Sequence, residues 1–75
     1  MITIAIEKLD PDRTNERFGY LFYGDAKQAG VRRGTQFQLA LGEHVGQEVL
    51  EAVEYVGFRP DTNRTFKGFR CQVIN

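Results

Sequence analysis

The chain has 75 residues, of which 41% are hydrophobic and 27% are charged, and its ten basic side chains balance its ten acidic ones. This length predicts a single domain spanning residues 1–75, and the apolar content excludes a disordered chain. Because the formal net charge is zero, no overall field attracts the protein to nucleic acid or to an anionic membrane. Binding to either would need a local patch.

A domain of this size has a small hydrophobic core, so its stability depends on additional support. Small domains commonly use disulfides, a metal or a partner subunit, and the single Cys71 excludes a disulfide within the chain. We therefore expect a protein partner or a homo-oligomer. No apolar run approaches the length that crosses a bilayer, and residues 1–8 lack the pattern of a signal peptide, which predicts a soluble, cytoplasmic protein without membrane contact.

The first half of the chain alternates apolar and polar residues with the period of a strand. Residues 2–9 predict a first strand and residues 10–15 a turn. Residues 17–23 predict a second strand, expected to be antiparallel to the first. Its alternation places Phe18, Tyr20 and Phe22 on one face.

The next segment is rich in glycine and is followed by a third strand. Residues 24–34 are predicted as a loop, in which Asp25 to Ala29 can form a helical turn that Gly30 ends. Residues 35–41 alternate again, with Phe37, Leu39 and Leu41 expected to face inward.

Residues 43–56 change to a helical period, and Gly57 would end the helix. The apolar residues of one arc are Val45, Val49, Ala52, Val53 and Val56, and Glu43, Gln47, Glu51 and Glu54 oppose them. Gly46 and the valines disfavour a helix, so the alternative is a strand over residues 49–58. Pro60 begins a turn, and residues 65–74 predict the last strand.

These elements predict an α+β fold with a small antiparallel sheet of about four strands and one amphipathic helix, in the order β-β-β-α-β. The alternative is a small five-stranded all-β barrel. Catalytic chemistry has little to draw on, because the chain has no serine, one histidine (His44) and one cysteine (Cys71). No zinc, calcium or nucleotide motif is present in the sequence. We predict a protein that is not an enzyme and uses no cofactor or metal.

Two fragments resemble families that bind RNA. Phe18-Gly19-Tyr20 is similar to the aromatic strand of the cold-shock domain, and Lys67-Gly68-Phe69 is similar to the start of the octapeptide of the RNA recognition motif. Arg70 and Cys71 then depart from the octapeptide, which places a small residue and a second ring there. The resemblance implies binding of single-stranded nucleic acid, but it assigns the chain to neither family.

Charge is distributed unevenly along the chain. Residues 55–75 carry four cations and one aspartate, whereas residues 43–54 carry four glutamates and no cation. Candidate nucleic-acid-binding residues in the basic part are Arg59, Arg64, Phe66, Lys67 and Arg70. Strand alternation divides them, because Phe69, Cys71 and Val73 face one side while Phe66 and Arg70 face the other. The hypothesis requires Arg59 and Arg64 to join Arg70 on one exposed surface.

Tyrosine and arginine are also typical of the residues that dominate protein interfaces. Candidate protein-interaction residues are Tyr20, Tyr23, Arg32, Arg33, Glu51 and Glu54. The sequence thus predicts a small non-catalytic binding module that acts through protein–protein interaction or regulation. The alternative is a protein that binds single-stranded nucleic acid with its basic, aromatic C-terminal hairpin.

Overall fold

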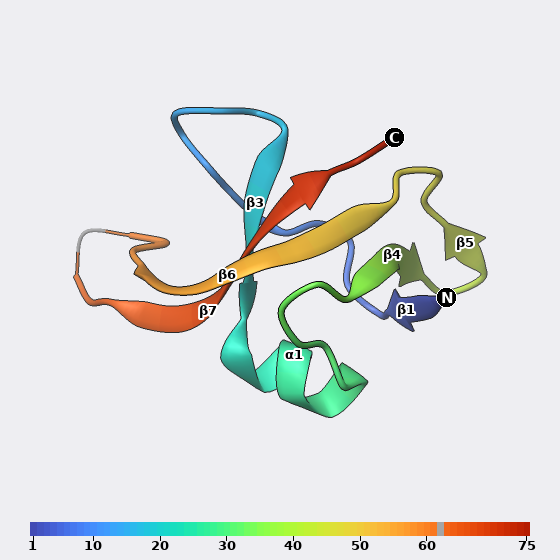
Figure 1. The fold of residues 1–75 in the computed structure, drawn as a ribbon, viewed down its shortest axis with the longest axis horizontal. Helices are drawn as coiled ribbons and strands as arrows, with labels where there is room; N and C mark the ends of the chain where they lie inside the picture. Colours follow the sequence, from blue (N-terminus) through green and yellow to red (C-terminus); the bar gives the residue numbers. More distant parts are fainter. Residues whose placement is uncertain (62) are drawn as a thin grey trace.

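The computed structural model describes residues 1–61 and 63–75, and they form one curled sheet and one helix (Figure 1). The elements in chain order are β1 (Ile2–Ile4), β2 (Asp10–Pro11), β3 (Phe18–Phe22), α1 (Tyr23–Ala29), β4 (Gln36–Leu41), β5 (His44–Val45), β6 (Leu50–Phe58) and β7 (Phe66–Val73). The α+β class therefore agrees with the structure, whereas the expected number of about four strands was wrong.

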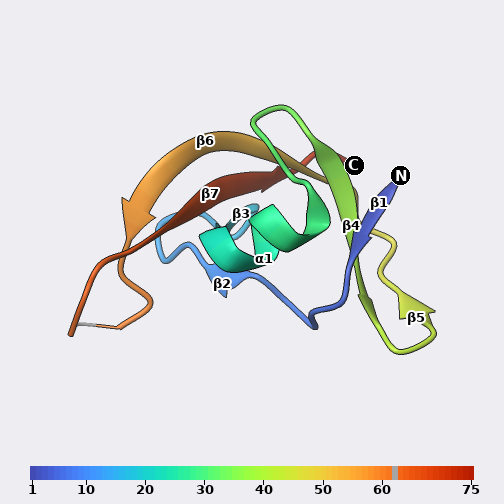
Figure 2. The same cartoon turned by 90° about the horizontal axis from the view of Figure 1, so that it is seen from below.

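The strands follow the order β1-β4-β6-β7-β3-β2 across the sheet, and β5 pairs with β4. The sheet is a half-barrel whose concave side faces α1 (Figure 2). Its two edge strands, β1 and β2, are joined by residues 5–9. Since α1 is part of the fold, the all-β alternative is wrong.

The core lies between α1 and the concave side of the sheet. Its most deeply buried side chains are Leu21, Ala26, Phe37, Ala52 and Cys71, each no more than 1% exposed. They come from β3, α1, β4, β6 and β7, so the core joins elements from the whole chain. Burying one large apolar side chain contributes about 1.5 to 3 kcal/mol, which makes this shared core the main source of stability.

Helix α1 occupies part of the segment that we predicted as a loop. It begins directly after Phe22, whose side chain makes no capping hydrogen bond, and its single fully buried residue is Ala26. Gly30 ends the helix in the left-handed conformation, with φ at 75°. The predicted helical turn and its glycine stop are confirmed, but the turn extends into a seven-residue helix.

The helix predicted over residues 43–56 was wrong, because this segment forms β5, a connection and β6. The alternative strand over residues 49–58 is close to the observed β6, which pairs antiparallel with β7. A register shift between Ala52 and Glu54 marks a β-bulge, which adds one residue to β6. The bulge breaks the strict alternation of the strand and gives its apolar residues a spacing that imitates a helix.

Two further predictions about the sheet were wrong. The first strand stops at Ile4 and pairs parallel to β4, whereas we expected an antiparallel partner in the aromatic strand. That aromatic strand, β3, pairs antiparallel with β7. In β4, Phe37 is fully buried, but Leu41 at the far end is 57% exposed, because β4 leaves the core there and turns into β5.

Candidate binding surfaces

The convex side of β3, β6 and β7 carries a layer of five rings, Phe18, Tyr20, Phe22, Phe58 and Phe66, which we call the outer aromatic layer. Tyr20 stacks on Phe58 with ring centroids 4.7 Å apart. Phe22 contacts both Phe58 and Phe66, at 5.1 and 5.4 Å. Phe58 is buried, while the other four rings are half-buried. The rings therefore pack mainly on one another.

A buried ion pair lies beside this layer. Arg70 Nε donates a hydrogen bond to Asp12 Oδ2 over 3.2 Å, and the Arg70 guanidinium lies 3.7 Å above the Phe18 ring. The second Asp12 oxygen accepts hydrogen bonds from the Thr14 hydroxyl at 2.6 Å and the Thr14 amide at 2.8 Å. The Tyr20 hydroxyl donates to Asp12 at 3.3 Å. Arg70 is thus held inside the fold by a partner carboxylate.

These contacts shift the titration of two groups. The hydrogen bonds from Thr14, assisted by Arg70 and Tyr20, lower the pKa of Asp12 from 3.8 to about 2. Burial raises the pKa of Tyr20, and the nearby Asp12 charge adds to this rise. At neutral pH the cluster therefore contains an ionised Asp12, a protonated Tyr20 and the Arg70 cation.

The other predicted nucleic-acid-binding residues divide into two groups. The Arg64 guanidinium lies 4.5 Å above the Phe66 ring, and Arg59 Nε donates to the Thr65 hydroxyl over 3.4 Å. Both arginines are exposed at the turn between β6 and β7. Lys67 pairs with Gly57 and, by strand alternation, faces the side opposite to Phe66. The structure therefore brings together Arg59, Arg64 and Phe66, but not Lys67.

Arg13 is a further cation at this surface that the sequence analysis missed. It lines a hollow of about 230 Å³ together with Tyr20, Phe58 and Arg59. Arg13 lies in the turn between β2 and β3, so only the pairing of β3 with β7 brings it close to the last hairpin.

A second surface is a groove between α1 and the concave side of β6 and β7, which we call the helix groove. Its volume is about 320 Å³, and it is lined by Tyr23, Ala26, Lys27, Gly30, Val31, Arg32, Tyr55 and Phe69. Tyr55 contacts Tyr23 and Phe69 edge to face, with ring centroids 6.0 and 5.4 Å apart. Tyr23 is 48% exposed and Tyr55 is 49% exposed.

The cations of the helix groove have no acidic partner among the residues that the structure describes. The two ion pairs found there both involve Arg70, so Lys27 and Arg32 are unpaired. No carboxylate lines the groove either. The groove is therefore basic as well as aromatic.

The predicted protein-interaction residues do not form one surface. Tyr23 and Arg32 meet in the helix groove, whereas Tyr20 belongs to the outer aromatic layer. Glu54 lies 3.9 Å from Arg70, and Glu51 accepts a hydrogen bond from Gln36 at 3.4 Å. The remaining candidate, Arg33, is exposed in the turn before β4. Tyr55 was missed because we placed it in a helix; as a strand residue, it is the direct partner of Phe69.

The two residues considered for catalysis lie in different environments. Cys71 is fully buried on the concave side of β7, and burial raises the pKa of its thiol to about 12. The thiol therefore stays protonated at neutral pH, and it donates to the Phe69 carbonyl at 3.4 Å. His44 is exposed in β5, where we had expected a helix start.

Neither a metal site nor a membrane span is found in the described parts of the chain. Across residues 1–61 and 63–75, no three His, Cys, Asp or Glu side chains gather as a set of metal ligands. The helix found in the same residues is too short to cross a bilayer. A comparison with known proteins found no family model, no curated protein and no solved structure that matches this chain.

Proposed function

We propose that this protein is a non-catalytic binding module whose helix groove holds an extended segment of a partner protein. The observation that carries the proposal is the pair of half-exposed tyrosines, Tyr23 and Tyr55, packed edge to face beside an open groove. Exposed rings that are already held in place supply contact area at little cost in entropy, which is why aromatic residues dominate interface energetics.

The charge of the groove indicates the chemistry of the partner segment. Lys27 and Arg32 lie at its border without carboxylate partners in the described residues, so they favour acidic side chains. Apolar atoms of Ala26, Val31 and Phe69 favour an aliphatic side chain between them. The segment that fits is therefore an aliphatic residue with acidic neighbours.

This function is tested by titrating the isotope-labelled protein with a synthetic peptide that places leucine and proline between glutamates. We expect amide chemical-shift changes around Tyr23, Tyr55 and Arg32, and at least a tenfold loss of affinity in Tyr23→Ala, since a hot-spot ring contributes about 2 kcal/mol or more. Val45→Ala is the matched control, because Val45 is also 48% exposed but lies in β5. Equal affinities of the two variants would contradict the proposal.

A second candidate function is binding of single-stranded nucleic acid at the β6–β7 turn. The observation that favours it is the stacking of Arg64 on Phe66, with Arg59 and Arg13 close to the outer aromatic layer. Phosphates attract such cations, and bases stack on exposed ring faces.

This candidate is tested with a fluorescent oligothymidylate at several salt concentrations. Binding should weaken steeply with salt, and the double variant Arg59→Ala/Arg64→Ala should flatten that dependence by about two units of slope. Lys67→Ala serves as the control, because Lys67 faces the other side of β7. No binding at low salt would exclude the nucleic-acid function.

A further inference from the structure

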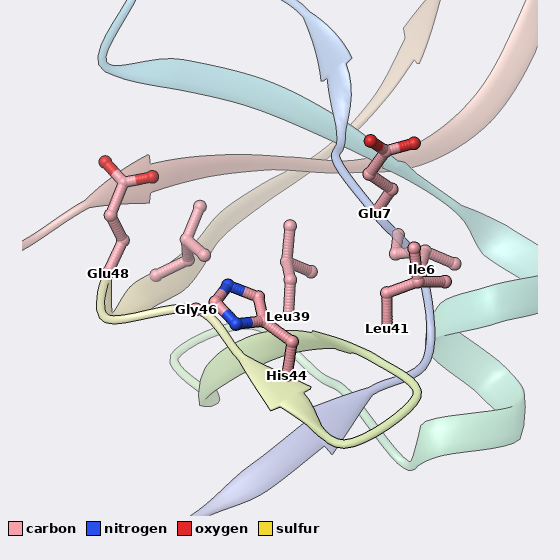
Figure 3. A pocket seen from close by; sticks show the side chains of 8 residues that line it. Ile6, Glu7, Leu39, Leu41, His44, Gly46 and Glu48 are labelled. Carbon is pink, nitrogen blue, oxygen red and sulfur yellow. The ribbon is translucent and has the colours of Figure 1, made fainter.

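The largest cleft among the described residues lies away from both surfaces discussed above, at the open end of the curled sheet (Figure 3). Its volume is about 490 Å³, and it is lined by Ile6, Glu7, Leu39, Leu41, His44, Gly46, Glu48 and Leu50. This volume falls within the range of small-molecule sites. In Figure 1, β5 and the turn between β6 and β7 lie at opposite ends of the molecule, so the cleft is also distant from the basic hairpin.

The cleft exists because β4 and β6 separate. They pair only at Gln36–Glu51 and Phe37–Leu50, after which β4 continues toward β5. Leu39 on one strand and Leu50 on the other therefore line the opening between them, and Ile6 lines it from the segment that follows β1. Leu50 is buried, while Ile6 and Leu39 are half-buried. Aliphatic side chains thus form the floor.

Two carboxylates stand on opposite sides of this floor. Figure 3 shows Glu48 on one side, Glu7 on the other and the His44 ring between them. No Lys or Arg in the described residues forms an ion pair with either glutamate, because both ion pairs there involve Arg70. The cleft continues into a hollow of about 210 Å³ that shares Glu7 and Glu48 and adds Glu16 and Lys8. Negative charge therefore predominates along the opening.

The wall that carries Glu48 is held in place by backbone hydrogen bonds. The Gly46 amide donates to the Leu39 carbonyl at 2.8 Å, and the Val49 amide donates to the Asn75 side chain at 2.6 Å. The Asn75 amide group donates in turn to the Gln47 carbonyl at 3.2 Å. A ligand therefore meets a wall that is already formed, which lowers the entropy lost on binding.

We propose that this cleft binds a small organic cation, an ammonium or guanidinium group attached to an aliphatic or aromatic body. The cation lies between the carboxylates of Glu7 and Glu48, where charge-assisted hydrogen bonds are the strongest available. The body covers Leu39, Leu50 and Ile6 and removes apolar surface from water. A neutral molecule would make only the second contact, and an anion would be repelled by both glutamates.

The charge requirement is tested with three probes that share one apolar body: 4-phenylbutylamine, 4-phenylbutanol and 4-phenylbutyrate. We expect the amine to shift the amide resonances of residues 6–7, 39–41 and 46–50, with at least tenfold higher affinity than the alcohol, and the carboxylate to leave the spectrum unchanged. Equal binding of amine and alcohol would overturn the proposal, and so would amine-induced shifts confined to other residues.

The two carboxylates are tested by substitution in the complete chain. Glu7→Gln and Glu48→Gln should each weaken amine binding about tenfold without changing the weak binding of the alcohol. Glu43→Gln is the matched control, because Glu43 is exposed in the turn next to β5 and does not line the cleft. If both cleft variants bind the amine as the unmodified protein does, the proposal is wrong.

Two further arms separate this site from other sources of the same signal. Tyr23→Ala changes only the helix groove and should leave amine binding unchanged, so failure of the proposed function does not affect this test. A lysine-containing peptide with aliphatic neighbours presents the same chemistry on a protein. If that peptide shifts the cleft residues and the amine does not, the occupant is a protein segment and the proposal of a small cation is overturned.

Discussion

The two faces of β3 and β7 are stabilised in different ways. On the concave face, Leu21 and Cys71 are at most 1% exposed and pack among apolar side chains. On the convex face, half-buried rings surround the Asp12–Arg70 pair, and each polar atom of that cluster has a directed hydrogen bond. Apolar packing depends on volume and tolerates changes in pH, whereas the convex cluster depends on charge and geometry. The predictions below test this difference.

The largest effect is expected where the two strands approach each other most closely. A Cβ at Gly68 would overlap the backbone carbonyl of Leu21, so both faces would have to move together. We expect Gly68→Ala to lower the free energy of unfolding by more than about 3 kcal/mol, beyond ordinary overpacking, because backbone cannot rotate away. Urea denaturation measures this loss. Gly24→Ala is the control, since a Cβ there has no neighbour within 4 Å; similar losses in both variants would refute the explanation.

A smaller effect should separate the concave core from the solvent. Leu21→Ala removes a side chain that is 1% exposed and should cost about 3 kcal/mol, in the usual range for a buried leucine. Leu41→Ala changes the same residue type at a position 57% exposed and should cost less than about 0.5 kcal/mol. The comparison uses the midpoint and slope of urea unfolding. A large loss in Leu41→Ala would mean that this leucine belongs to the core, as the sequence had predicted.

The smallest of the three effects should appear only in acid and only through the convex face. Because the pKa of Asp12 is lowered in the fold, its contribution is present above the ordinary value of 3.8 and is lost as pH falls toward about 2. Thermal unfolding of the unmodified protein should therefore become easier across this window. Asp12→Asn should be less stable at neutral pH but lose less stability on acidification than the unmodified protein does. Parallel acid profiles of the two proteins would show that Asp12 is not responsible.

Much of the fold could be predicted where a strand is regular and amphipathic. Alternation located β3, β4 and β7 within one or two residues at each end, and it placed Phe69 and Cys71 on the core side. It failed at β6 because the bulge at Ala52–Glu54 changes the period. It also missed α1, which is one short helix without a side-chain cap. The parallel pairing of β1 with β4 depends on contacts between distant segments, which local patterns do not encode.

The binding surfaces were less predictable than the fold for the same reason. Tyr23 and Arg32 could be chosen by residue type, but their groove is completed by Tyr55 and Phe69 from two later strands. The cleft at the open end of the sheet joins Glu7 with Glu48, which lie far apart in the sequence and have no motif in common. Such sites become visible only when the order of the strands is known.

The β6–β7 hairpin, described above as the middle of the sheet, also has a consequence for how the chain folds. It is the one long pairing between strands that follow each other directly, so closing it costs little loop entropy. In contrast, β1 must find β4 across more than half of the fold's helical and strand elements, and it contributes only three residues. We expect the hairpin to form early and to protect its amides longest in hydrogen exchange. The N-terminal strand then docks last and exchanges first.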